Sequence, residues 1–313
     1  MSAKADHEPA VVPEWVGSPE RGSVRLLRLM AWLSLRLGRR WSRVVLYPVA
    51  LYFLLLAPTS RAASRAYLRR VLLREPGWRD LYRHFLSFAT TVHDRVYLLN
   101  GRFDLFDIAV YGSEPVHELV RAGQGAFLLG AHLGSFEIIR AVGRERALPV
   151  AMVMYEENAR RINAALAAIN PAVRPDIVPL GRVDSMLLVR DRLDQGTVLG
   201  ILADRTVQSE AGAPMDFLGA PADFPLGPFR LAAMLRRPVI FMAGLYLGGN
   251  RYAIYFEPLA DFSDVTREQR GREMELAMGR YVACLERYCR MAPYNWFNFF
   301  SFWQRADTGA EHS

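Results

Sequence analysis

Cysteine is almost absent from this sequence of 313 residues. The two cysteines, Cys284 and Cys289, lie five positions apart in a segment whose pattern predicts a helix, so they point in different directions. They form neither a disulfide framework nor a pair of metal-binding thiolates, and no H-E-x-x-H or paired C-x-x-C motif occurs. The sequence therefore indicates no metal and no other cofactor, and it agrees with a reducing, cytoplasmic setting.

Acidic residues are missing from one long stretch. Between Arg21 and Arg74 there are twelve arginines and no aspartate or glutamate, in a chain whose formal net charge is +7. Such a positive segment suits an anionic membrane surface, a nucleic acid, or solvent alone. Its middle, Val44–Ala57, carries no charge in fourteen residues, which a nucleic-acid-binding arm does not need. We therefore expect a membrane partner and no nucleic acid.

This apolar run is short of the roughly 20 residues that a membrane-spanning helix needs, and Pro48 would disturb a helix inside it. Four aromatic residues lie where an interfacial belt is expected: Trp32, Trp41, Tyr47 and Tyr52. We predict that residues 21–75 form a basic, apolar helical segment that attaches to, or inserts into, an anionic membrane. A helix buried in the core is the alternative.

The remaining chain predicts one α/β domain over residues 76–305, between a loosely ordered arm (residues 1–20) and a short tail (residues 306–313). A helix is predicted over Arg79–Leu99 from apolar residues spaced by three and four. Seven short apolar runs near residues 107, 125, 149, 176, 197, 238 and 252 predict strands. Helices are predicted between them over Phe136–Arg146, Ala159–Ile169, Asp184–Asp194 and Gly227–Leu235. This alternation predicts a central mixed sheet with helices on both faces.

The stretch "GAFLLGAHLGSFEIIRA", residues 125–141, predicts a strand, a tight turn and a helix. Ligand sites of α/β proteins lie beyond the carboxyl ends of the strands, which is where His132 falls. Gly130 and Gly134 allow a tight turn and a close approach of a ligand. Glu137, on the first turn of the helix, can accept a hydrogen bond from one imidazole nitrogen. The other nitrogen is then a candidate general base.

No G-x-S-x-G motif occurs, so the sequence offers no activated serine for this base. The hydroxyl group that loses its proton is therefore expected on a substrate, which indicates direct transfer between two bound substrates. A structural histidine at a strand end is the alternative.

The "HLGSFE" segment (residues 132–137) resembles the H-x4-D/E signature of glycerolipid acyltransferases. The longer "LLGAHLGSFEI" is similar to the lauroyl or myristoyl acyltransferases of lipid A biosynthesis. Residues 202–242 and 292–303 resemble two further blocks of that family. The resemblance implies transfer of a fatty acyl chain from an acyl carrier protein or coenzyme A thioester to a hydroxyl or amine of a lipid-like acceptor. It also implies a location at the cytoplasmic face of the inner membrane.

The resemblance assigns roles to individual residues. His132 is the base and Glu137 its orienting partner, with Gly134 and Ser135 lining the substrate site. Asp204 and Arg205 match the strand-end acid and its neighbour in the second block. Arg205 and backbone N–H groups near the turn are expected to stabilise the oxyanion, or Arg205 grips an anionic group of the substrate.

One block departs from the family. Its members commonly have arginine and proline after the tyrosine that corresponds to Tyr155, where this chain has Glu156 and Glu157. Arg160 or Arg161 is expected to replace that arginine from one helical turn further on. The departure leaves several acceptors open: a lipid A precursor or other glycolipid, a lysophospholipid, an aminolipid, or a pigment or polyene head group.

Three phenylalanines after the second block, Phe217, Phe224 and Phe229, either line a groove for the acyl chain or pack in the core. The departure near Tyr155 also keeps a second function open, a non-catalytic lipid-binding or scaffold protein that retains the fold.

Overall fold

The computed structural model describes residues 24–145, 148–172, 176–181, 184–205 and 212–303, so the predicted arm and tail lie outside the described residues. The basic N-terminal segment forms α2 (Val24–Ser42), the 3-10 turn η1 (Arg43–Val45), α3 (Leu46–Leu56) and α4 (Pro58–Leu72). The helix predicted from Arg79 is α5 (Trp78–Leu99). A break at Ala57 separates α3 from α4, which begins at Pro58. Pro48 lies in the first turn of α3, where a missing N–H group is tolerated.

All seven predicted strands are present, and they form one sheet. They are β1 (Asp107–Tyr111), β2 (Ala126–Gly130), β3 (Val150–Tyr155), β4 (Ile177–Leu180), β5 (Val198–Leu202), β8 (Pro238–Tyr246) and β9 (Arg251–Asp261). The order is β1-β9-β8-β2-β5-β3-β4, with every neighbouring pair parallel except β8 and β9. The predicted mixed sheet is therefore confirmed.

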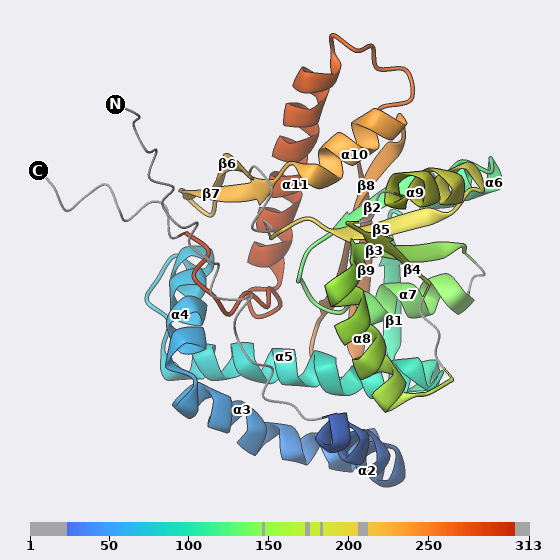
Figure 1. The fold of residues 1–313 in the computed structure, drawn as a ribbon. Coiled ribbons are helices and arrows are strands. Elements are labelled where there is room, and N and C mark those ends of the chain that lie inside the picture. Colours follow the sequence, from blue (N-terminus) through green and yellow to red (C-terminus); the bar gives the residue numbers. More distant parts are fainter. Residues whose placement is uncertain (1–23, 146–147, 173–175, 182–183, 206–211, 304–313) are drawn as a thin grey trace, which may run out of the picture.

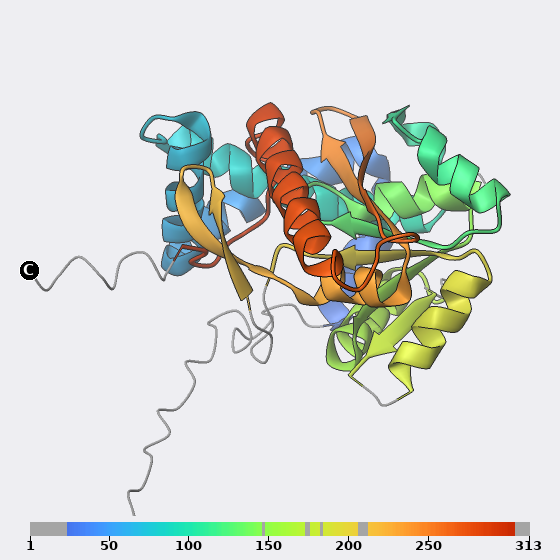
Figure 2. The same ribbon diagram turned by 90° about the horizontal axis from the view of Figure 1, so that it is seen from above.

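The remaining elements are η2 (Phe103–Leu105), α6 (Glu114–Arg121), α7 (Phe136–Glu145), α8 (Glu156–Ile169), α9 (Ser185–Asp194), α10 (Gly227–Leu235) and α11 (Arg270–Met291). A separate antiparallel hairpin is formed by β6 (Gly212–Phe217) and β7 (Ala220–Pro225). Seen from above, α11 lies between this hairpin and the sheet (Figure 2). Neither the hairpin nor α6 was among the predicted elements.

Helices cover both faces of the sheet, as predicted. The alternation of side chains along β2 shows it: Phe127 and Leu129 belong to the cluster that includes α11, whereas Leu128 packs in a cluster with Ile138 and Ile139 of α7. All five residues of β2 are buried, which is expected for a central parallel strand.

The helices α2 and α3 form a lower layer beneath α5 and α8 (Figure 1). Arg39 of α2 fixes this layer, because its guanidinium makes two hydrogen bonds of 2.8 Å to the fully buried carboxylate of Asp94 on α5. Tyr252 of β9 donates a third hydrogen bond to Asp94. The layer is thus tied both to α5 and to the sheet.

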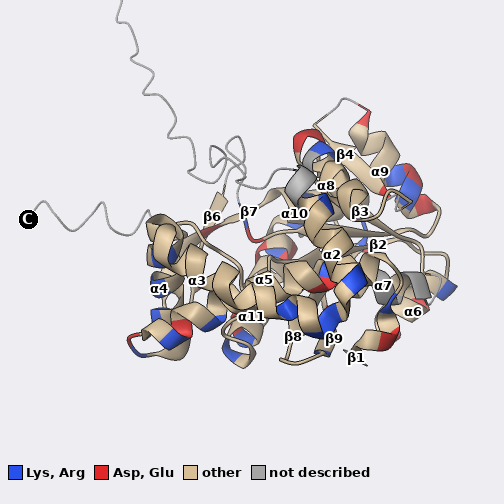
Figure 3. Ribbon diagram, turned by 90° about the horizontal axis from the view of Figure 1, so that it is seen from below, with Lys and Arg blue, Asp and Glu red and all other residues tan. Residues whose placement is uncertain are grey.

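The outer face of this layer is strongly apolar. Seen from below, α3 carries no charged residue (Figure 3). Large apolar side chains are exposed along α2, η1 and α3: Leu29, Trp32, Leu33, Leu35, Leu37, Trp41, Val44, Val45, Tyr47, Leu51, Tyr52, Phe53, Leu55 and Leu56. An apolar surface of this extent marks an interaction site. Within the described ranges, no single helix combines the length and apolar character of a membrane span. The stretch Leu27–Leu56 passes that test only together with α4, across a bend of 96°.

Candidate active site

The sheet register brings His132 and Asp204 together. Strands β2 and β5 are parallel neighbours, and their last residues, Gly130 and Leu202, are register partners. His132 and Asp204 each follow their strand end by two residues, so both side chains lie beyond the same edge of the sheet. The N–H group of Ala203 donates to the carbonyl of Gly130 and extends the pairing past the strand ends.

Asp204 is fully buried and accepts three hydrogen bonds. Its Oδ1 atom lies 2.9 Å from Nδ1 of His132, and its Oδ2 accepts from the backbone N–H of the same histidine at 2.9 Å. The indole N–H of Trp296 donates to Oδ2 at 3.0 Å. A buried carboxylate held in this way is a fixed acceptor, which orients the imidazole ring.

The electrostatics favour a neutral histidine beside an ionised aspartate. Burial opposes the charge of Asp204, but the His132 ring and then Arg205 hold the pKa of that carboxyl well below its usual range. Burial and the charge of Arg205 lower the pKa of His132, and Asp204 opposes this shift. The carboxylate places the proton on Nδ1, so Nε2 has the free lone pair of a base. The side chain of His132 is 32% exposed, so a substrate can reach it.

The turn after His132 is packed against β8 and the C-terminal segment. Gly134 has a φ angle of +71°, and a Cβ atom there would lie 2.0 Å from the carbonyl oxygen of Gly244. The N–H groups of Gly134 and Ser135 donate to the carbonyls of Asn295 and Gly244, each at 2.8 Å. The expectation that N–H groups near the turn stabilise an oxyanion is therefore not supported for His132, Gly134 and Ser135, since all three bond within the protein. Ser135 itself is 2% exposed.

Glu137 does not take the predicted place beside the imidazole. It lies in the first turn of α7, where its Oε1 is 2.8 Å from Nε of Arg95 on α5. The carboxylate on Nδ1 of His132 belongs to Asp204 instead. The reason is geometric: α7 packs against α5 and directs this glutamate toward that helix, while strand pairing supplies the nearer acid.

Arg205 lies next to the dyad. Its guanidinium donates to the carbonyl of Phe297 at 3.1 Å and lies 5.0 Å from the ring centre of Phe300. Its Nε atom is buried without a hydrogen-bond partner among the described residues. A cation in this position can receive negative charge that develops on a substrate.

A sequence model described as bacterial lipid A biosynthesis acyltransferase matches residues 89–305. That range covers more than two thirds of the chain and includes His132, Glu137 and Asp204. The chain belongs to this family. No individual curated protein matched the sequence.

In this family member, the acidic pair after Tyr155 forms the start of a helix. Tyr155 ends β3 and precedes α8, whose first turn contains Glu156 and Glu157, where the helix dipole favours negative charge. Arg160 is exposed on α8. Arg161 belongs to the same helix, but its side chain lies outside the described residues. The start of α8 lies at the sheet edge that carries Asp204, because β3 and β5 are parallel neighbours.

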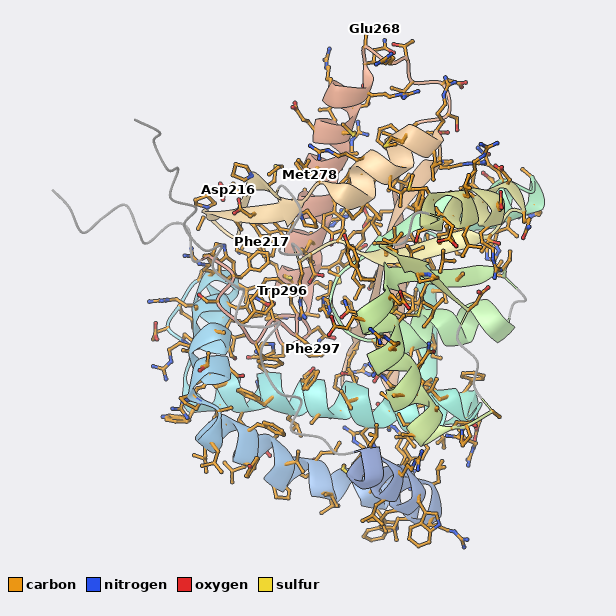
Figure 4. All side chains as sticks on the ribbon, in the orientation of Figure 1. Asp216, Phe217, Glu268, Met278, Trp296 and Phe297 are labelled. Atoms are coloured by element: carbon orange, nitrogen blue, oxygen red, sulfur yellow. The ribbon has the colours of Figure 1, made fainter. Side chains whose placement is uncertain are left out.

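The three phenylalanines predicted as groove or core are fully buried. The ring of Phe217 contacts Trp296 at 5.3 Å and Phe224 at 5.6 Å, and Phe229 contacts Tyr281 at 5.8 Å. Figure 4 shows Phe217, Trp296 and Phe297 in one region between α4, α5 and α11. This packing matches the interpretation that the three phenylalanines belong to the core. Phe217 packs against Phe224 and Trp296, and Trp296 donates a hydrogen bond to Asp204.

The sequence reasoning missed the C-terminal contributions to the site. Trp296 fixes Asp204, and the buried Asn295 supports the turn through its backbone carbonyl while its side chain bonds both backbone groups of Tyr246. The signal was present in "APYNWFNFFSFW", residues 292–303, where polar asparagines interrupt an aromatic run. Within the described ranges, no three His, Cys, Asp or Glu side chains gather as a metal ion requires.

Proposed function

We propose that this protein transfers a fatty acyl chain from an acyl thioester, carried by an acyl carrier protein or coenzyme A, to a hydroxyl or amine of a lipid-like acceptor. The observation that carries the proposal is the hydrogen bond between His132 and the buried Asp204 at paired strand ends, in a chain of the lipid A acyltransferase family. A histidine with an oriented ring and a free Nε2 is the base that such a transfer needs.

The proposed reaction begins when Nε2 of His132 removes the proton from the acceptor hydroxyl. The oxygen attacks the thioester carbonyl carbon, a C–O bond forms, and the carbonyl oxygen becomes an oxyanion that Arg205 stabilises. Collapse of this intermediate breaks the C–S bond, and the thiolate takes the proton from His132. Asp204 keeps the ring in one tautomer and stabilises the imidazolium between the two proton transfers. Arg160 and Arg161 are proposed contacts for an anionic acceptor head group.

We place the reaction at the cytoplasmic face of the inner membrane. The exposed apolar side chains of α2 and α3 support peripheral attachment, with Trp32 and Trp41 exposed by 56% and 74%. A basic, apolar helical layer of this kind suits anionic lipid, and it holds the site next to lipid acceptors.

The test is release of free thiol from acyl carrier protein and coenzyme A thioesters by the purified full-length protein in detergent, with and without a lipid extract. His132→Ala is expected to lower turnover by roughly 10²–10⁴-fold, the contribution typical of a general base. Asp204→Asn is expected to lower turnover nearly as much, because the side-chain amide of asparagine can hold the imidazole of His132 in the wrong tautomer. Turnover at the wild-type rate in either variant would overturn the mechanism.

Glu137→Gln distinguishes the two acids. We propose that Glu137, through its pair with Arg95, positions the start of α7, so this change lowers turnover without moving the pH at which His132 titrates. If His132 titrates at a different pH in Glu137→Gln, Glu137 would be the residue that orients the imidazole of His132, as first predicted. If the wild type consumes no thioester even with lipid extract, the non-catalytic lipid-binding function becomes the better account.

A further inference from the structure

His84 is a fully buried histidine on α5 that takes no part in the proposed proton transfers. Its Nε2 lies 2.8 Å from the carbonyl oxygen of Trp296, and its Nδ1 lies 2.8 Å from Oγ of Ser64 on α4. A carbonyl oxygen can only accept, so Nε2 carries the hydrogen and Nδ1 accepts from the hydroxyl of Ser64. Burial lowers the pKa of His84 to about 4, so the ring is neutral at neutral pH and has this single tautomer.

The peptide unit between Trp296 and Phe297 continues this line of hydrogen bonds to the base. Its carbonyl accepts from His84, and its N–H group, which belongs to Phe297, donates to the carbonyl of His132 at 2.8 Å. A peptide unit is planar, so its C=O and N–H groups move together. Ser64, His84 and this one peptide unit therefore form a continuous line that ends on the backbone of His132.

The side chain of Trp296 holds the other member of the dyad. Its indole N–H donates to Oδ2 of Asp204 at 3.0 Å. Figure 4 shows Trp296 and Phe297 in the angle between α4 and α5. Because the side chain of Trp296 binds Asp204 and the peptide unit that follows it binds His132, a displacement of this short segment would disturb both partners at once.

The surroundings of His84 are aromatic. Its ring centre lies 4.7 Å from that of Phe299 and 5.5 Å from that of Tyr67. A phenyl ring would suit such neighbours, and a polar ring buried among them is costly unless its nitrogen atoms are hydrogen-bonded. What histidine adds at this position is the pair of hydrogen bonds, one to α4 and one to the segment that holds the dyad.

From this geometry we propose that His84 is a positioning residue for the reaction. Through the peptide unit of Trp296 and Phe297 it holds His132 and Asp204 in place, and Ser64 fixes the orientation of the His84 ring. The inference rests on the proposed function and adds to it two residues that precede the matched range 89–305. Helices α4 and α5 then serve catalysis as well as the packing of the N-terminal segment.

The experiment measures kcat and KM for thiol release by the full-length protein in detergent. His84→Phe keeps an aromatic ring and removes both hydrogen bonds. It is expected to lower kcat about 10²-fold, the loss that a slightly misplaced catalytic group can cause, and to leave KM unchanged. His84→Gln should recover most of this loss, because its side-chain amide can donate from the position of Nε2.

His93→Phe is the matched control. His93 is a second buried histidine of α5, but its Nε2 lies 2.8 Å from Oγ of Ser42 on α2. This variant should lose thermal stability and keep a kcat near that of the wild type. Ser64→Ala tests the other end of the line. It should lower kcat in the wild type and add nothing in the His84→Phe background, because Ser64 acts through His84.

A wild-type kcat in folded His84→Phe would overturn the inference and leave the acyltransferase function intact. Equal losses of kcat in His84→Phe and His93→Phe would also overturn it, since the role of His84 would then be structural. If His84→Phe does not fold, the comparison is with His84→Asn, whose shorter amide cannot reach the carbonyl of Trp296. A kcat equal to that of His84→Gln would then contradict the positioning role. Absence of thiol release by the wild type with either donor would instead defeat the proposed function, and this inference with it.

Discussion

Arg205 is the residue whose charge most directly tunes the candidate base. It lowers the pKa of His132, second only to burial, and its guanidinium lies next to the dyad. Removing the charge in Arg205→Gln should therefore raise the pKa of His132. A base must be unprotonated to act, so the acidic limb of the plot of log kcat/KM against pH should move to higher pH. Loss of oxyanion stabilisation should also lower kcat about 10²-fold.

The pH profile of thiol release measures both effects. Arg190→Gln is the matched control, since Arg190 is 63% exposed on α9 and should change neither the limb nor kcat. An acidic limb that stays in place in Arg205→Gln would show that Arg205 does not act on the titrating base.

The same residues show how far sequence reasoning reaches at this scale. His132 could be identified because one strand, two glycines and one histidine lie within a few residues. Its partner could not be identified from spacing, because Asp204 lies 72 positions later and reaches the ring only through the pairing of β2 with β5. The family resemblance placed Asp204 at a strand end but did not say which strand lies beside β2. Glu137 was the nearest acid in sequence, and packing against α5 directs it to Arg95.

At the scale of elements, the N-terminus of α5 depends on Asp80. Its carboxylate accepts a hydrogen bond from the N–H of the N-cap residue Gly77, and it also binds Arg74 and Tyr294. Hydrogen bonding from Arg74, and then from Tyr294 and Gly77, holds the pKa of Asp80 far below its ordinary value against the effect of burial. Asp80→Asn should therefore reduce the free energy of unfolding by about 1 kcal/mol at neutral pH.

The pH dependence of that loss follows from the direction of the shift. A carboxyl with a lowered pKa in the folded state contributes stability that is complete above its unfolded pKa, about 3.9, and that is lost as the pH falls through the folded value. The difference in the free energy of unfolding between wild type and Asp80→Asn should thus shrink below about pH 4. Thermal unfolding at several pH values measures it, with Asp104→Asn as the control for an exposed ion pair. If the difference in the free energy of unfolding stays constant down to low pH, the ionised carboxylate of Asp80 does not stabilise the N-terminus of α5.

Helices and strands were predictable where apolar residues recur with a clear period or form a continuous run. Elements whose sequence lacks such a pattern were not predictable. The seven sheet strands and helices such as α10, with its predicted limits Gly227–Leu235, follow directly from the residues. The β6–β7 hairpin was missed because Pro214, Asp216 and Pro225 interrupt the apolar alternation of a strand. Its turn is marked only by Leu218 and Gly219, both at positive φ. Helix α6 has eight residues, too few for a clear period.

At the scale of the whole molecule, the proposed membrane attachment and the proposed catalysis belong to different layers. The α2–α3 layer lies beneath α5 and α8 (Figure 1). The dyad of His132 and Asp204 lies beyond the carboxyl ends of β2 and β5. Sequence alone could not separate membrane from carrier protein as partners of the basic segment, because its arginines form one run in the chain. The bend at Ala57 divides them between two helical stretches that meet at 96°.

This division predicts that membrane binding depends on α3 rather than on apolar exposure in general. Leu51 and Leu55 are exposed by 46% and 54% on α3, and burial of a leucine side chain contributes roughly 1.5–3 kcal/mol. Leu51→Glu/Leu55→Glu should therefore weaken binding to anionic vesicles at least tenfold in a sedimentation assay. Thiol release in detergent should persist, because neither residue contacts the dyad.

Leu187→Glu provides the matched control, since Leu187 is 63% exposed on α9, away from the α2–α3 layer. Size-exclusion chromatography excludes aggregation as the cause of any loss. Equal vesicle binding by wild type and the α3 variant would show that the α2–α3 layer does not bind the membrane. Equal losses in the α3 variant and in Leu187→Glu would instead show that scattered apolar contacts, and not a defined layer, hold the protein on lipid.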